Sequence, residues 1–276
     1  MKSLFVAQAI KSYSTEGLMD KAKKANDKLI LDPRDLPEDW DQYCEDGYKY
    51  VVEIRLFKKY WATMRDLLLP QPNAIILDGG CGTGAMFPMI LENFWPPKKI
   101  VAVDWSRKML HEAKKTATKL IAPRLSIFGS LFNFERQDLS QLYPWPDNNF
   151  DAQVYSITLY YLPHRGWEIA LKESYRTIKP GGYIYASIMF KGWDFPAMIK
   201  KNLLKEFLAN PYRCVKAAGV RKTARKFHAY AEQGIIEYPS REEFLAFLVN
   251  LGFKIEAEEG IFQGGGMAVR AKKIDG

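Results

Sequence analysis

The sequence contains no long uninterrupted run of apolar residues. Among its 276 residues, no stretch approaches the roughly 20 consecutive apolar residues that an α-helix needs to cross a bilayer. The start of the chain carries one early lysine, Lys2, and its short apolar stretch is broken by Gln8. A secretory signal needs more positive charge and a cleavage site of small residues, so we do not expect one here.

Cysteine is also scarce. Cys44, Cys81 and Cys214 lie far apart and form no C-x-x-C pair. This pattern argues against a disulfide framework and against a zinc cluster. We therefore expect a reduced, cytoplasmic protein with no metal site, and the sequence leaves a peripheral membrane contact open.

Acidic residues are too few to balance the basic ones, which gives a formal net charge of +8 at pH 7. Nearly all of this excess lies in residues 191–236, where ten lysines and arginines stand against three acidic residues. A basic surface favours anionic partners but does not indicate a fold. A solvated helical face explains the same charge pattern equally well.

The composition, 47% hydrophobic and 14% aromatic, is that of a globular chain with a large core. The length favours one α/β domain with additions. We predict a helical N-terminal extension or cap over residues 1–72 and a single domain over 73–276. The basic segment 191–236 would be a helical insertion in that domain.

Between residues 73 and 190, short β-branched runs alternate with helical stretches, which is typical of β-α-β units and a parallel sheet. The predicted strands in this region are 74–78, 100–104, 132–137, 150–157 and 182–189. A final pair of strands follows, the last of them over 267–272.

Two helices outside this region are indicated by periodicity. The apolar spacing predicts one helix over residues 45–69, before Pro70. A second helix should begin after Ser240, which with Glu243 forms a capping-box pattern, and should stop at Gly252.

A glycine-rich turn, Gly79 to Gly84, follows the first predicted strand directly. Glycines let the backbone approach a ligand closely, and the helix that follows presents free N–H groups to it. Taken alone, the turn is compatible with a nicotinamide enzyme, because Gly80, Gly82 and Ala85 satisfy the dinucleotide fingerprint and Asp104 lies near the expected ribose-binding acid.

The features around this turn decide between the alternatives. Five of them, in order over roughly residues 74–190, resemble the motifs of class I S-adenosylmethionine (SAM)-dependent methyltransferases. They are Asp78-x-Gly80-x-Gly82-x-Gly84, the run Asp104-Trp105-Ser106 with Met109-Leu110, the pair Asp138-Leu139, the turn 146–151, and Lys179-Pro180-Gly181-Gly182. The resemblance implies a Rossmann-like α/β fold: a seven-stranded, mostly parallel sheet with an antiparallel final strand, a helical N-terminal extension and a helical lid inserted after strand five.

The same resemblance implies SAM as the cofactor. Asp104 would accept hydrogen bonds from the ribose hydroxyls, while Asp138 and the N–H of Leu139 would bind the adenine, which Trp105 and Met109 would sandwich. Plain core packing is the alternative for the apolar members. The expected cofactor-binding residues are Asp78, Gly80, Gly82, Gly84, Asp104, Trp105, Met109, Asp138, Leu139 and Ser156.

The end of strand four faces the methyl group in this family. Here it carries neither an Asn-Pro-Pro-Tyr nor an Asp-Pro-Pro-Tyr motif, and no Pro-Cys pair. Many relatives have His-His where this chain has Tyr160-Tyr161, a departure that leaves the substrate contacts open. We predict His164 as the candidate general base and the two tyrosines as orienting phenols. A surface loop histidine is the alternative for His164.

The sequence is most similar to the small-molecule and lipid branch of the family, and its C-terminal part is loosely similar to quinone C-methyltransferases. An amphipathic pattern over 195–208 predicts a lid over an apolar acceptor, a surface resting on anionic lipid, or a site for an anionic group of the acceptor. Aromatic residues of the N-terminal extension would close the other side: Trp40, Tyr43, Tyr48, Tyr50 and Trp61.

We therefore expect methylation of a small apolar or aromatic acceptor at oxygen, nitrogen or carbon. One alternative is an RNA methyltransferase that grips phosphates through residues 191–236, although we do not favour a nucleic-acid partner. Another is a non-catalytic binding subunit with a disused pocket. The sequence does not predict the oligomeric state.

Overall fold

A computed structural model describes residues 31–122, 131–192, 210–217 and 221–274. The amphipathic stretch predicted over 195–208 lies outside the described residues. None of the helices within these ranges is long and apolar enough to cross a membrane.

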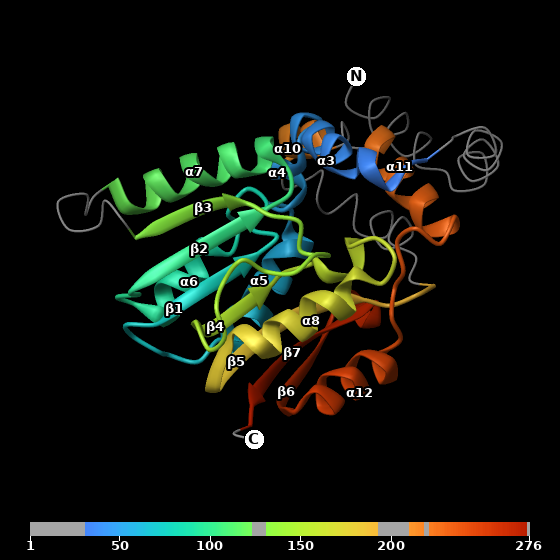
Figure 1. The fold of residues 1–276 in the computed structure, drawn as a ribbon. Helices are drawn as coiled ribbons and strands as arrows, with labels where there is room; N and C mark the ends of the chain where they lie inside the picture. Colours follow the sequence, from blue (N-terminus) through green and yellow to red (C-terminus); the bar gives the residue numbers. More distant parts are fainter. Residues whose placement is uncertain (1–30, 123–130, 193–209, 218–220, 275–276) are drawn as a thin grey trace.

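The centre of the fold is one seven-stranded sheet with the order β3-β2-β1-β4-β5-β7-β6 (Figure 1). β1 to β5 pair in parallel, and β7 is antiparallel to both of its neighbours. The predicted fold class is therefore confirmed. The strands are β1 (Ile75–Gly79), β2 (Lys99–Asp104), β3 (Phe132–Arg136), β4 (Phe150–Tyr155), β5 (Ile178–Met189), β6 (Phe253–Ile261) and β7 (Gly266–Lys273).

Two strand boundaries differ from the prediction for local backbone reasons. β4 ends at Tyr155, because Ile157 has a positive φ of 55° and leaves the extended region. β5 begins already at Ile178, which pairs with Phe150 before the register shifts. Gly181, also at positive φ, lies within β5 where the register shifts. A glycine pair after a proline predicts a turn, but it does not reveal the pairing that precedes it.

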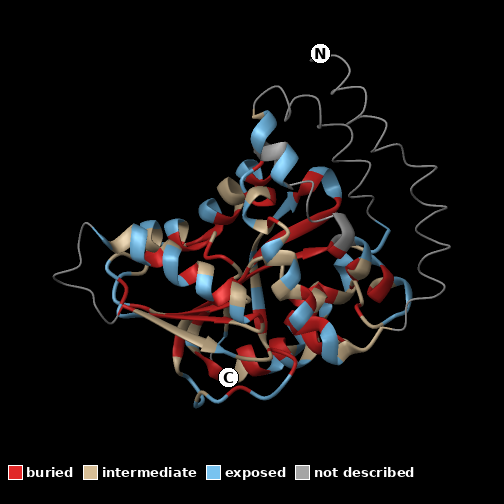
Figure 2. Cartoon of the chain, turned by 90° about the horizontal axis from the view of Figure 1, so that it is seen from above, coloured by how far each residue is buried: buried red, intermediate tan, exposed pale blue. Residues whose placement is uncertain are grey.

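Helices cover both faces of the sheet (Figure 1). α8 (Gly166–Thr177) and α12 (Arg241–Leu251) pack together against β5, β6 and β7. α5 (Arg55–Leu67), α6 (Phe87–Phe94) and α7 (Arg107–Ile121) form the opposite layer. Figure 2 shows the consequence: buried residues follow the strands and the inward helix sides, while exposed residues lie on the outer helix surfaces.

The helix predicted over residues 45–69 is in fact two helices. A short turn separates α4 (Tyr48–Val51) from α5. Gly47, at φ 114°, directly precedes α4. Gly47 separates α4 from α3, and tertiary packing explains this break, because a Cβ on Gly47 would lie 2.8 Å from the carbonyl oxygen of Lys216. By contrast, the capping box of Ser240 and Glu243 and the left-handed stop at Gly252 are confirmed.

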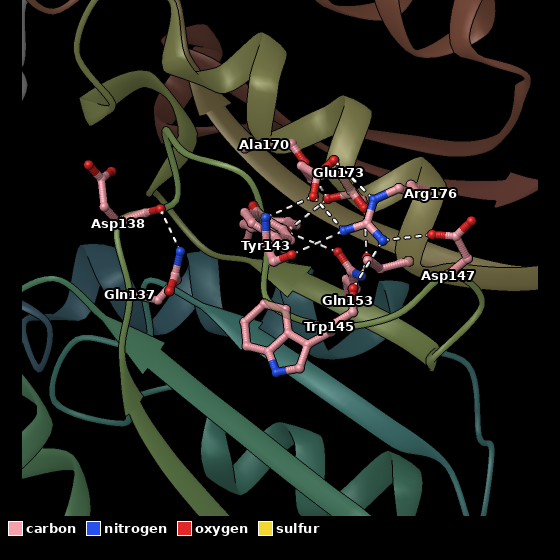
Figure 3. A network of polar contacts seen from close by, with 12 residues as sticks. Gln137, Asp138, Tyr143, Trp145, Asp147, Gln153, Ala170, Glu173 and Arg176 are labelled. Atoms are coloured by element: carbon pink, nitrogen blue, oxygen red, sulfur yellow. Dashed lines mark hydrogen bonds and ion pairs between the residues drawn. The ribbon is translucent and has the colours of Figure 1, made fainter.

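A polar network joins α8 to the neighbouring strand and loop (Figure 3). Its members Glu173, Gln153 and Thr177 are buried, whereas Asp147 is exposed. Arg176 donates to Glu173, to Asp147 and to the carbonyl oxygen of Trp145. Gln153, fully buried in β4, donates to Thr177 at 2.7 Å. Because each of these buried groups has a partner, the network fixes α8 on the sheet without leaving an uncompensated charge.

Four helices lie over the carboxyl ends of the strands, at the top of Figure 1, and we call them the cap. They are α3 (Leu36–Glu45), α4, α10 (Pro211–Ala217) and α11 (Arg221–Glu232). α10 packs on α4, and α11 packs on α3. Asp39 of α3, 7% exposed, accepts hydrogen bonds from Lys226 at 2.6 Å and from Tyr230 at 2.8 Å. N-terminal and C-terminal segments therefore form the cap together.

We expect the substitution Asp39→Asn to loosen α11, because it removes a half-buried ion pair that contributes roughly 1–2 kcal/mol. Hydrogen exchange of the α11 amides should become about tenfold faster, while the amides of β1 and β4 stay unchanged. Glu38→Gln, at the exposed neighbouring position, is the matched control. Equal exchange rates in α11 of the variant and the wild type would contradict this role of Asp39.

Candidate active site

The glycine turn begins where β1 ends in the middle of the sheet. Gly80 and Gly82 both have positive φ, 70° and 54°. At Gly80 a Cβ would lie 2.2 Å from the side chain of Thr158, so this glycine lets two loops touch. At Gly82 a Cβ would meet only the ring of Tyr48, at 3.5 Å. The backbone at Gly82 is therefore open toward the space under the cap.

Asp104 lies at the end of the neighbouring strand, β2, and faces this turn. Its two carboxylate oxygens accept the N–H of Gly82 at 2.9 Å and the N–H of Ser106 at 2.8 Å. Desolvation raises the pKa of Asp104 to about 6, although these backbone hydrogen bonds lower it in part. Each oxygen keeps a further lone pair for a ligand hydroxyl.

Asp78, at the end of β1, is fully buried, and neither carboxylate oxygen has a hydrogen-bond partner among the described residues. Desolvation, reinforced by the nearby charge of Asp104, raises the pKa of Asp78 from 3.8 to about 8. An unpartnered buried carboxyl group destabilises the fold. A bound cation or donor group would remove that penalty.

One pocket connects these carboxyl ends with the cap. Its lining residues come from the glycine turn, the loops after β2, β3 and β4, the first turn of α7, and the cap helices α3 and α4. They are Trp40, Tyr48, Gly80, Gly82, Asp104, Trp105, Met109, Gln137, Leu139, Ser156, Ile157, Thr158, Tyr161 and Leu162. The pocket thus lies at the topological switch point between β1 and β4, where ligands bind in open α/β sheets.

Most of the predicted cofactor residues are brought together here. Seven line the pocket: Gly80, Gly82, Asp104, Trp105, Met109, Leu139 and Ser156. Gly84 is further along the turn, where a Cβ would clash with Phe87, and Asp78 is fully buried and outside the lining. Asp138 is also outside the lining, and its Oδ1 accepts two hydrogen bonds from Ser140.

The three predicted catalytic residues occupy different environments. Tyr161 lines the pocket, and its ring packs edge-on against Trp40, with centroids 4.9 Å apart. Tyr160 is buried and stacks on Tyr238 at 5.1 Å. His164 is exposed, outside the pocket lining, and its backbone N–H donates to the carbonyl oxygen of Ile235. Its role as a base stays a prediction.

Several lining residues were missed by the sequence motifs. Gln137, Ile157, Thr158 and Leu162 belong to no motif, although Ile157 and Thr158 directly follow the strand end that was singled out. Ile157 is also unusual because a β-branched residue at φ 55° is strained by roughly 1–3 kcal/mol. Of the N-terminal aromatic residues predicted to close the site, Trp40 and Tyr48 do line it.

Comparison with known proteins agrees with this geometry. A family model described as "Methyltransferase domain" matches residues 77–186, the segment from β1 into β5. The sheet order and a ligand site at the switch point thus define a methyltransferase-type α/β protein. Residues 77–186 therefore form a methyltransferase domain of the class I SAM-dependent type, and the predicted enzyme class is confirmed.

Among curated relatives, a demethylmenaquinone methyltransferase from Listeria monocytogenes is 28% identical over 141 residues, which cover 50% of this chain and 54% of the relative. A ubiquinone/menaquinone biosynthesis C-methyltransferase from Geotalea daltonii is 26% identical over 184 residues, 66% of this chain and 72% of the relative. The chain therefore matches only about half the length of the first relative.

Among solved structures, the fold is similar to the N-methyltransferase NodS from Bradyrhizobium japonicum, which was crystallised with S-adenosyl-L-homocysteine (SAH). The TM-score is 0.53 at 12% identity, over 81% of this chain and 90% of that chain. At this identity the likeness concerns the fold alone.

The residues present fit SAM. The amino group of its methionine part is a cation that would satisfy the orphaned carboxyl of Asp78. The open backbone at Gly82 and the free lone pairs of Asp104 suit its sugar. The apolar side chains of Met109 and Leu139 suit its adenine.

We expect Asp78→Asn to raise the melting temperature of the ligand-free protein at neutral pH. Because the folded-state pKa is about 8 and the ordinary value is 3.8, folding keeps a proton that the unfolded chain releases. The resulting destabilisation of the wild type increases between these two pH values. The difference in melting temperature between variant and wild type should therefore grow from pH 5 to pH 8 and then level off.

Thermal unfolding at several pH values measures this difference. Asp66→Asn, on the exposed side of α5, is the control and should give a small difference without this trend. A difference for Asp78→Asn that stays constant or shrinks between pH 5 and pH 8 would show that the carboxyl is not held protonated.

Proposed function

We propose that this methyltransferase binds SAM between the glycine turn and Asp104 and transfers its methyl group to a small, apolar aromatic acceptor under the cap. The observation that carries the proposal is one pocket lined by two chemically different groups of residues. The backbone of Gly82 and the carboxylate of Asp104 line it together with the aromatic residues Trp40 and Tyr161.

When bound, the cofactor supplies a methyl group on a positively charged sulfur, which is already a good leaving group. Asp104 would hold the ribose through its free lone pairs, and Asp78, ionised by the amino group nearby, would hold the methionine part. Met109 and Leu139 would pack against the adenine, with Trp105 beside them. Asp138 would approach the adenine amino group through Oδ2, since Oδ1 is engaged by Ser140.

The acceptor is assigned to the apolar and aromatic part of the lining. Ile157, Leu162 and Tyr161 belong to this part, and Trp40 stands edge-on to Tyr161. A flat ring can stack in such a site, which suits a hydroquinone better than a charged or sugar-like acceptor. Similarity to a demethylmenaquinone methyltransferase and to a ubiquinone/menaquinone biosynthesis C-methyltransferase supports the same acceptor class.

Positioning and exclusion of water would provide most of the rate enhancement. Burial raises the pKa of both Tyr160 and Tyr161, so at neutral pH each phenol keeps its proton and can donate a hydrogen bond but not take a proton. A base is needed only if the acceptor must be deprotonated. His164 stays the candidate, and it would have to reach the pocket from its exposed loop position.

The RNA alternative is less well supported. Part of the basic segment is engaged inside the cap, since Lys226 pairs with Asp39 and Thr223 donates to Asp46. A phosphate-binding surface would need such groups to be free. The unoccupied capacity of Asp78 and Asp104 likewise argues against a binding subunit with a disused pocket.

The acceptor class is tested by incubating the protein with SAM and a demethylmenaquinol with a short side chain. We expect a product heavier by one methylene group, and Tyr161→Leu should lower turnover at least tenfold, whereas the control Leu142→Ala, at an exposed site, should not. If His164→Ala keeps full turnover between pH 6 and 9, His164 is not a base.

Absence of product from an otherwise SAH-binding protein would reject this acceptor class. In that case, binding of labelled tRNA that weakens steeply with salt would favour the RNA methyltransferase.

The cofactor site is tested by Asp104→Asn. The amide keeps one acceptor oxygen but loses the charge and turns a donor toward one ribose hydroxyl, so SAH affinity should fall at least 30-fold, or about 2 kcal/mol. Isothermal titration measures the change, and Asp147→Asn, exposed and remote from the pocket, is the control. An unchanged dissociation constant would refute the ribose assignment.

A further inference from the structure

The turn after β4 is held in a conformation that its sequence disfavours. Ile157, at φ 55°, is a β-branched residue in the left-handed region, where glycine or asparagine is normally found. It lines the pocket together with its neighbours Ser156 and Thr158. Strained residues persist only where the surroundings hold them, and they concentrate at functional sites.

A serine from the neighbouring strand holds this turn in place. The backbone N–H of Ile157 donates to the Oγ of Ser187 at 2.9 Å. Ser187 lies in β5 and is fully buried, so no water competes for its hydroxyl group. Among the described residues, its hydroxyl group hydrogen-bonds to this turn and to Tyr60.

Tyr60 of α5 completes the arrangement from the other direction. Its phenol oxygen lies 2.7 Å from the Oγ of Ser187 and 2.6 Å from the Oγ of Ser156. The ring itself is 2% exposed and stacks on Phe262, with centroids 5.0 Å apart. The phenol therefore links both serines and is fixed by packing from α5 and from the loop between β6 and β7.

The turn is tied to the glycine turn as well. Thr158 donates to the carbonyl oxygen of Gly80 at 3.3 Å and packs where a Cβ of Gly80 would be. A change in the backbone at Ile157 would therefore reach the carboxyl end of β1, where the cofactor is proposed to bind. Neither Tyr60 nor Ser187 lines the pocket itself.

We propose that Ser187 and Tyr60 are positioning residues that hold the strained Ile157 turn in the shape the pocket needs. The inference rests on the proposed function, since it assigns these two residues to the same site. It makes α5 a part of the active-site architecture in addition to its packing on the sheet.

The test is a double-mutant cycle with SAH as the probe, measured by isothermal titration. Ser187→Ala removes the acceptor for the Ile157 N–H, so the strained turn should relax and SAH affinity should fall about tenfold. Tyr60→Phe leaves that acceptor in place and should cost about threefold. Glycine adopts positive φ without strain, so in an Ile157→Gly background the Ser187→Ala change should cost less than twofold.

Ser174→Ala is the matched control. Ser174 is also a fully buried, hydrogen-bonded serine, but it lies in α8 away from the pocket. It should lower the melting temperature comparably and leave SAH affinity within twofold of the wild type.

Three results would overturn the proposal: unchanged affinity in Ser187→Ala, an equal loss with and without Ile157→Gly, or an equal loss in Ser174→Ala. The cycle does not depend on the acceptor. If the quinol is not methylated but Ser187→Ala costs less affinity in the Ile157→Gly background, only the acceptor class is rejected. If the quinol is methylated but Ser187→Ala costs the same affinity in both backgrounds, only the positioning role is rejected.

Discussion

The buried carboxyl group of Asp78 is the constraint on which the site depends. It lies at the end of the central strand, neither oxygen has a hydrogen-bond partner among the described residues, and the charge of Asp104 disfavours its ionisation. Burying such a group without a partner destabilises the folded state, and the packing of the hydrophobic cluster around β1 must offset this cost. The unpartnered carboxyl group suits a cationic ligand, whose binding would stabilise the fold.

The cap is anchored to the same part of the sheet. Asp41 of α3 accepts hydrogen bonds from the hydroxyl of Ser106 and from the N–H of Lys108, at the start of α7. Ser106 in turn donates its N–H to Asp104. The helix that supplies Trp40 to the pocket is thus connected through one serine to the carboxylate proposed to bind the ribose. On its other side, Asp39 connects α3 with α11.

Through the contact between Asp39 and α11, the described part of the basic segment 191–236 helps to hold the cap together. This part packs on acidic residues of the N-terminal helices, so some of its positive charge is balanced inside the cap. The net charge counted along the sequence therefore overstates the positive charge that an anionic partner could contact. The aromatic rings that close the pocket, by contrast, are brought over the glycine turn only because these two distant segments fold together.

The sequence by itself determined the sheet, the glycine turn, the acids after β1 and β2 and the capped helix α12, because each depends on local periodicity, turn chemistry or a short motif. It did not determine the break at Gly47, the position of His164 outside the pocket, or the role of Ser187. Those depend on contacts between residues far apart in the chain, such as Gly47 with Lys216 and Ile157 with Ser187. Only tertiary structure decides such pairs, since no local preference encodes which distant side chain will satisfy a strained or buried group.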